Sequence, residues 1–280
     1  MAATKDFKVR IKSITSIKKI TKAMKMVAAS KLRQVQRGLD IVRPSFNALN
    51  SIYNEYANSA SIENKKNRLI IAISSDRGLC GGINTNAVKA TKNSIKTIKN
   101  EIPDAHISLF TIGDKGKDVL SREHGKLIIK AVSDVSKKSI SFGAASLIAE
   151  ELLKQQFDTY HLIYSKFKSV ISQSLVEEQI SSANSLENAF FEFNGYEFDS
   201  DKSELLYDFY EYFLGYKIFS ALLENATSEQ GARMNAMDSA SRNAGEMIDK
   251  LTLIYNKARQ ASITRELIEI ISCASAVSSK

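Results

Sequence analysis

The stretch of this chain with the clearest chemical potential is a glycine-rich segment, Asp76-Arg-Gly-Leu-Cys-Gly-Gly82. It follows a short apolar run and precedes a helix-like segment, which is where phosphate-binding turns occur in α/β proteins. The segment lacks the Gly-Lys-Ser/Thr of a P-loop, and its glycines do not have the spacing of a dinucleotide fingerprint. We therefore favour a tight turn that exposes Arg77 for protein contact over an enzymatic nucleotide site.

A second candidate for chemistry is the strongly basic N-terminal segment. Residues 1–43 contain twelve Lys or Arg against only Asp6 and Asp40, a net charge of +10, whereas the whole chain carries +8. Such a segment is typical of an import peptide, of an arm that binds nucleic-acid phosphates, or of the basic face of a structural helix. We prefer the structural helix, because the apolar pattern continues to Tyr56 and no exposed aromatic residues are interleaved with the basic ones.

Other candidates for catalysis or ligand binding are few. The two cysteines, Cys80 and Cys273, cannot form a disulfide framework and do not have metal-ligand spacing, and the three histidines are scattered. We therefore expect a reduced compartment and no catalytic, cofactor-binding or metal-binding residues. No run of about 18 apolar residues occurs, so any membrane association is expected to come through partners.

Two long helices are predicted at the ends of the chain, and they must position everything else. Interior prolines interrupt helices, and only Pro44 and Pro103 occur in the sequence. Pro44 is expected to bend or divide the N-terminal helix, which is predicted over residues 1–57. Coiled-coil spacing of alternating three and four residues defines an apolar seam of Leu32, Val35, Leu39, Val42, Phe46, Leu49, Tyr53 and Tyr56. Upstream, the seam continues with Ile14, Ile17, Thr21, Met24 and Ala28.

The C-terminal helix is predicted over residues 204–280, where no proline occurs. At 1.5 Å per residue such a helix reaches roughly 110 Å, too long to be buried in a small domain. Its seam is richer in small residues than the N-terminal one, so the two helices could interlock as an antiparallel coiled coil. An alternative is that each seam packs separately against the middle of the chain. The C-terminal seam comprises Met237, Ala240, Ala244, Met247, Leu251, Ile254, Ala258 and Ala261.

Between the helices, the pattern predicts a Rossmann-like α/β domain over residues 69–203, preceded by a polar linker at 58–68. Alternating strands and helices favour a mainly parallel sheet with covering helices. Asn84 or Thr85 is expected to cap the first of these helices, and Asp114 the second. Strands are predicted at 69–73, 106–112, 127–132 and 160–167, helices at 84–102, 114–122 and 141–156, a hairpin extension at 169–180 and an irregular loop at 181–203.

Four segments carry a resemblance to a known family. They are Lys19–Lys31 (KITKAMKMVAASK), Ser75–Gly82 (SDRGLCGG), Ser228–Gly245 (SEQGARMNAMDSASRNAG) and Tyr255–Ser272 (YNKARQASITRELIEIIS). In these segments, which bracket the whole chain, the sequence resembles the gamma subunits of F-type ATP synthases. It departs from the family at Cys273, where a glycine is usual.

The resemblance implies a rotor shaft that is not itself an enzyme and binds no ATP. Its paired helices would turn inside a ring of alpha and beta subunits, while the α/β domain stands on the membrane c-ring beside the small central-stalk subunit (delta or epsilon). The implied location is the matrix side of the mitochondrial inner membrane, with the cytoplasmic side of a bacterial plasma membrane as the alternative. The main rival is a basic coiled coil that binds nucleic acid.

The resemblance also assigns contact residues. It implies that Arg77 meets beta-subunit loops, together with Arg259, Gln260 and Thr264 of the C-terminal helix. Met24 is placed near the same contact, with packing in the seam as an equal alternative. Tyr196 and Glu197 align loosely with the part of the family that meets the membrane ring.

Overall fold

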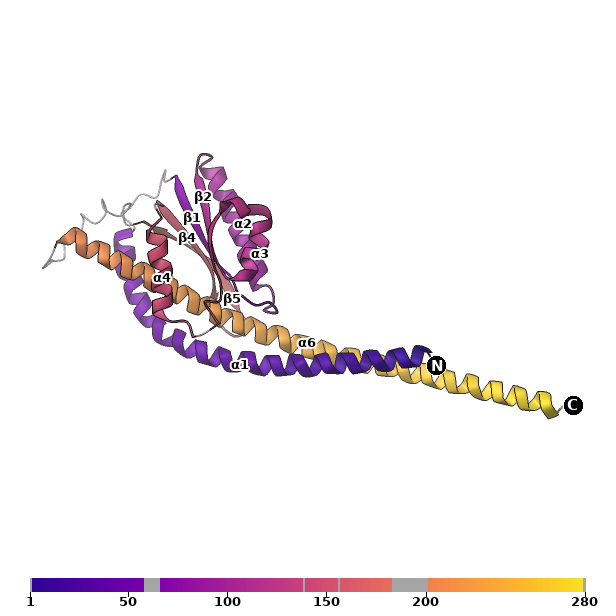
Figure 1. Ribbon diagram of the computed structural model, residues 1–280. Coiled ribbons are helices and arrows are strands. Elements are labelled where there is room, and N and C mark those ends of the chain that lie inside the picture. The colour runs from indigo at the N-terminus through magenta and orange to yellow at the C-terminus, as the bar shows by residue number, and fades with distance from the viewer. Residues whose placement is uncertain (1, 58–65, 138, 156, 183–200, 279–280) are drawn as a thin grey trace. The chain divides into compact units, whose positions relative to one another are not determined.

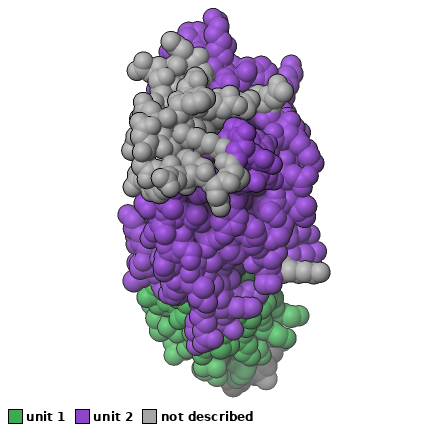
Figure 2. All heavy atoms as spheres, turned by 90° about the vertical axis from the view of Figure 1, so that its left-hand side faces the viewer, with its two compact units in different colours: residues 1–27, 234–280 green, residues 28–233 purple. Residues whose placement is uncertain are grey.

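A computed structural model of the chain describes residues 2–57, 66–137, 139–155, 157–182 and 201–278. The chain divides into two compact units, Ala28–Arg233 and a smaller unit of Met1–Val27 with Met234–Lys280, which Figure 2 colours separately. Each long terminal helix contributes to both units: α1 is Ala2–Ala57 and α6 is Lys202–Ser278. Within the described part of the chain, no helix is long and apolar enough to cross a membrane.

The larger unit is built on a five-stranded sheet. Strands β1 to β4 run parallel and β5 is antiparallel to β4, in the order β3-β2-β1-β4-β5. The central strand β1 is buried along nearly its whole length, as expected of an apolar run covered on both faces. The strands are β1 (Asn67–Ile73), β2 (His106–Ile112), β3 (Ile128–Val132), β4 (Thr159–Phe167) and β5 (Gln173–Ser181).

Helices cover both faces of this sheet. On one face lie α2 (Ile83–Glu101) and α3 (Asp114–His124), followed by the short helix η1 (Gly125–Leu127). On the other face lies α4 (Phe142–Leu153), together with the parts of α1 and α6 that belong to this unit (Figure 1). The predicted α/β fold with a mainly parallel sheet is therefore confirmed.

The long helices pack on the sheet through aromatic side chains. Tyr53 of α1 stacks on Phe213 of α6 with ring centroids 4.0 Å apart, and both rings are buried against the sheet. Leu39 of the predicted seam is fully buried, and Leu32 nearly so. Helix α1 continues without a break through Pro44, so this proline does not divide the helix.

In the smaller unit, α1 and α6 run antiparallel. The ammonium group of Lys25 lies 2.6 Å from the carboxylate of Asp238. One coiled-coil heptad earlier in α1, Lys18 lies against Gly245, which is one heptad later in α6. The predicted antiparallel pairing of the two terminal helices is therefore confirmed within this unit.

The predicted seams need correction in phase. Met247 and Ile254 of α6 are about half exposed, and so is Ile17 of α1. Burial in α6 instead follows the neighbouring positions Ile248 and Tyr255. Apolar residues occupy both adjacent positions of the helix, so the three-four rhythm alone could not decide which of them turns inward.

The element bounds differ from the predicted ones by a few residues. Strand β1 already begins at Asn67, inside the predicted linker, and α4 ends at Leu153 rather than at 156. The hairpin extension is confirmed as β5. Positions 58–65 of the linker and 183–200 of the irregular loop lie outside the described residues. The division into shaft helices, linker and globular domain stays a prediction.

Candidate functional site

The glycine-rich loop between β1 and α2 is held by a compact set of side-chain bonds. The amide of Asn84 donates to the hydroxyl of Ser75 at 2.7 Å and to the sulfur of Cys80 at 3.2 Å, and its oxygen accepts from the Ser75 backbone N–H at 2.9 Å. The Ser75 hydroxyl also donates to the Arg77 carbonyl at 2.6 Å. Asn84 therefore orders the loop and does not cap α2, whose N-cap is Gly82. Asp114 likewise lies inside the first turn of α3.

The tip of this loop presents three exposed residues, Arg77, Gly78 and Leu79. Leu79 is 63% exposed and has a φ of 64°, a left-handed backbone conformation that is strained for a residue with a side chain. Gly81 shares this φ without strain, because it has no side chain. The predicted exposure of Arg77 is confirmed. The exposure and left-handed backbone of Leu79 were not predicted from the sequence, because they depend on the hydrogen bonds that order the loop.

Helix α6 holds the loop in place through hydrogen bonds of Arg233. The guanidinium of Arg233 donates to the Gly78 carbonyl at 3.3 Å and to the Glu229 carboxylate at 2.6 Å. Burial raises the pKa of Glu229, while the charge of Arg233 opposes that shift. The buried Arg233–Glu229 pair thus attaches the loop tip to the long C-terminal helix. Their one-turn spacing on a helix was the signal available in the sequence.

The base of the loop meets the ends of β1 and β2 in a tight junction. The Ser74 hydroxyl accepts from the Gly116 N–H at 2.9 Å, and Gly113 crosses Ser74 closely with a φ of 99°. A side chain at Gly113 would place its Cβ 2.5 Å from the Ser74 carbonyl oxygen. Asn225 of α6 donates to that same carbonyl at 3.4 Å.

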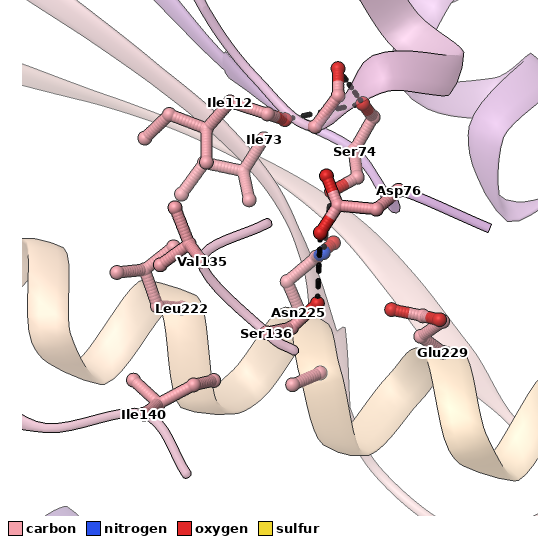
Figure 3. A pocket seen from close by; sticks show the side chains of 12 residues that line it. Ile73, Ser74, Asp76, Ile112, Val135, Ser136, Ile140, Leu222, Asn225 and Glu229 are labelled. Carbon is pink, nitrogen blue, oxygen red and sulfur yellow. Dashed lines mark hydrogen bonds between the residues drawn. The ribbon is translucent and has the colours of Figure 1, made fainter. Parts of the chain in front are cut away.

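A small pocket beside this junction tests the nucleotide-site alternative. It lies near the carboxyl ends of β1 and β2, where open α/β sheets bind their ligands, and Figure 3 shows Asp76 and Glu229 among its lining residues. Its volume is about 20 Å³, room for about one water molecule, whereas ligand pockets measure roughly 300–1,000 Å³. Two carboxylates at its border also disfavour phosphate. The geometry therefore does not fit a nucleotide.

Four other predicted contact residues lie in the smaller unit. Arg259, Gln260 and Thr264 are all exposed on α6, and Arg259 lies 6.0 Å from the centre of the Tyr255 ring. Met24 is half-buried beside Lys25, which pairs with Asp238.

The structure does not bring Met24 to the other predicted contact residues of this unit. About twenty residues of α6 separate the partner of Lys25 from Arg259, or roughly 30 Å along the helix. Tyr196 and Glu197 lie outside the described residues. Among the residues that the structure does describe, no group of three or more His, Cys, Asp or Glu could hold a metal ion.

The end of α6 carries a second exposed surface. Five large apolar residues between positions 263 and 271 are 49–65% exposed. Exposed apolar patches of this kind are typical of surfaces that bind a protein, a membrane or a ligand. The residues are Ile263, Leu267, Ile268, Ile270 and Ile271.

Comparison with known proteins gives a consistent result. A model of the ATP synthase family matches residues 3–277. The ATP synthase gamma chain of Pelagibacter ubique is 42% identical over 97% of this chain and 98% of its own length. The mitochondrial ATP synthase F(1) complex subunit gamma of Rattus norvegicus is 43% identical over 99% of this chain and 100% of its own length.

A solved structure agrees with these relatives. The central stalk and c-ring structure of the Tetrahymena thermophila mitochondrial ATP synthase contains a chain that is 29% identical and superposes with a TM-score of 0.69. The match covers 79% of this chain and 99% of that one. These comparisons give no support to the nucleic-acid-binding alternative.

Proposed function

This chain belongs to the family of ATP synthase gamma chains, and from that premise we propose that it is the central rotor shaft of a proton-driven ATP synthase. In this role it performs no catalysis itself. Its rotation presents a different side of the paired helices to each beta subunit in turn. Each catalytic site then shifts between open and closed states according to the contacts it meets.

The observation that carries this proposal is the exposed apolar end of α6. Ile263, Leu267 and Ile270 lie at this end of α6, where they are 49%, 53% and 65% exposed. Exposed isoleucine and leucine on a single helix need a covering surface. A ring of alpha and beta subunits around the helix end would supply this covering surface without binding any one side chain in a fixed pocket.

The polar residues near this end suit a sliding contact. Arg259 and Gln260 are exposed, and the Thr264 hydroxyl donates to the carbonyl one turn earlier at 3.0 Å. Exposed charge and amide groups can form and break bonds with successive beta subunits at small net cost. We assign Arg259, Gln260 and Thr264 to beta-subunit contact, and Arg77 to a second contact formed by its own loop.

The two other assignments have less geometric support. Met24 is half-buried next to the Lys25–Asp238 pair, so it serves both the seam between the helices and the outer surface. Tyr196 and Glu197 are assigned to the contact with the membrane ring on the family resemblance alone.

The proposed partners are an alpha–beta hexamer, the small central-stalk subunit and the c-ring. The similar Tetrahymena chain comes from a structure of a central stalk with its c-ring, which supports the last of these partners. Gamma chains of mitochondria are among the relatives, at 43% identity for the rat protein. We therefore place the chain at the mitochondrial inner membrane and, within it, on the matrix side. A bacterial plasma membrane is the alternative, because the Pelagibacter chain is equally similar.

The test is co-purification. The full chain carrying an affinity tag is expressed together with alpha and beta subunits, and the stoichiometry of the captured complex is measured by native mass spectrometry. We expect one copy of this chain with three copies each of alpha and beta, and ATP hydrolysis by the captured complex. A homo-oligomer of this chain without alpha and beta would refute the proposal.

A further inference from the structure

Strand β4 extends beyond the end of its parallel neighbour β1. The pairing of β1 with β4 ends at Ala72 and Ile163, yet β4 continues to Phe167. On its other side β4 stays paired with β5 along this extension. Alternate residues of a strand direct their backbone groups to opposite neighbours. Ser165 and Phe167 therefore turn their N–H and C=O groups toward the side where β1 has ended.

Side chains from the two long helices take the place of the missing strand. The Ser165 N–H donates to the Asn225 oxygen at 3.4 Å, and its carbonyl accepts from the Ser228 hydroxyl at 3.0 Å. The Phe167 N–H donates to the Glu224 carboxylate at 2.8 Å, and its carbonyl accepts from the Arg43 guanidinium at 2.5 Å. All four backbone groups are bonded, three to α6 and one to α1.

Arg43 and Glu224 also bind each other. The Arg43 Nε and Nη2 atoms lie 2.8 and 2.9 Å from the two carboxylate oxygens of Glu224, a bidentate geometry. Glu224 is 3% exposed, so Arg43 compensates a carboxylate that is removed from water. The pair joins α1, α6 and β4 in one ring of bonds.

Apolar packing fixes which faces of the long helices meet the sheet, because a large rotation would expose those faces. The hydrophobic effect is non-directional, so a small twist that keeps the same faces in contact costs little apolar burial. Hydrogen bonds lose their energy when the geometry changes. The bonds to Ser165 and Phe167 therefore resist small twists more steeply than the aromatic contacts around Phe213 do.

From this geometry we infer that Arg43, Glu224, Asn225 and Ser228 form the joint that carries torque between the sheet and both long helices. They act as positioning residues and touch no reacting group. This inference rests on the proposed function, since only a rotor needs such a joint. A second attachment lies on β5, where the Tyr53 hydroxyl accepts from the Ser181 N–H at 3.1 Å and the Tyr210 hydroxyl donates to the Ser181 carbonyl at 2.9 Å.

The test measures the torsional stiffness of the rotor in the assembled alpha–beta complex. The exposed Cys273 is replaced by serine, and a bead is attached to a cysteine introduced by Lys126→Cys. The hexamer is immobilised, and stiffness is obtained from the angular fluctuations of the bead. Glu224→Gln removes the charge that orders Arg43 and so weakens two of the seven described contacts that join the long helices to β4 and β5, the ion pair of Lys217 with Glu178 being the seventh. We expect stiffness to fall, by at most about 30%.

Two further variants separate this effect from a general loss of stability. Arg43→Lys keeps the charge but not the bidentate geometry, and we expect it to lower stiffness as Glu224→Gln does. Leu152→Ala opens a cavity in the core beneath α4 without touching the joint. It should lower the unfolding temperature and leave stiffness unchanged.

The outcomes are distinct. If Glu224→Gln and Arg43→Lys assemble with wild-type stiffness, or if Leu152→Ala softens the rotor equally, the joint is refuted while the rotor function stands. If the wild-type chain forms no complex with alpha and beta subunits, the proposed function itself fails.

Discussion

Gly113 offers the sharpest test of how the loop junction is built. An alanine there would place its Cβ 2.5 Å from the Ser74 carbonyl oxygen and 2.7 Å from the Ser74 hydroxyl. The backbone φ of 99° adds strain, because side chains rarely adopt it. Either the alanine or Ser74 must move, and Ser74 is bonded to Ile112, Gly113 and Gly116.

The magnitude follows from these terms. Backbone strain at the φ of 99° and ψ of 138° found here costs about 1–3 kcal/mol for a residue with a side chain. A shift of Ser74 would break about two buried hydrogen bonds at about 1 kcal/mol each. Gly113→Ala should therefore destabilise the chain by about 3–5 kcal/mol, which for a protein of this size lowers the unfolding temperature by roughly 6–20 °C.

The assay is thermal and chemical unfolding of the full chain, followed by circular dichroism. The matched control is Gly78→Ala, in the same loop, where an added Cβ meets no atom within 4 Å. We expect the control to change stability by less than about 0.5 kcal/mol. If the two variants lost the same stability, or if Gly113→Ala lost none, the reasoning about this junction would be wrong.

Three other substitutions probe the rest of the structure. Glu177→Gln should make the stability of the chain less dependent on acid pH. The hydrogen bond from His161 lowers the pKa of Glu177 below its ordinary 4.5, so the stability that Glu177 contributes is present above pH 4.5 and is lost as the pH falls through the folded-state pKa. Denaturant unfolding at a series of pH values measures this effect. Tyr53→Phe leaves the buried N–H of Ser181 without its acceptor and should cost about 1–3 kcal/mol in denaturant unfolding. Leu79→Gly should stabilise the free chain by about 0.5 kcal/mol, because the backbone strain that is relieved slightly exceeds the entropic cost of ordering a glycine on folding. A loss of stability would show that the Leu79 side chain makes stabilising contacts in the free chain.

Much of the fold could be predicted because its signals are local. The run of apolar residues from Leu69 to Ile73 is buried on both faces as expected, and the absence of proline after Pro103 allowed the long C-terminal helix. The helix seams were harder to predict. Met247 and Ile248 are both apolar neighbours on one helix, and only the partner helix determines which of them turns inward.

The candidate site was less predictable, because its geometry depends on bonds between distant segments. Asparagine is a favoured residue type at helix N-caps, yet Asn84 forms hydrogen bonds to Ser75 and Cys80 inside the loop. The support of Gly78 by Arg233 joins positions 155 residues apart in sequence. No periodicity or spacing indicates such a pair without the fold.

The central claim is that this chain turns inside an alpha–beta hexamer. It can be tested by attaching a fluorescent probe to the exposed position Lys126→Cys, in a chain whose exposed Cys273 is replaced by serine, while Cys80 stays buried. With the hexamer fixed to a surface through its beta subunits and ATP supplied, single complexes are then observed. We predict rotation of the probe in one direction that stops when ATP is removed. Continued ATP hydrolysis with a stationary probe would contradict the account.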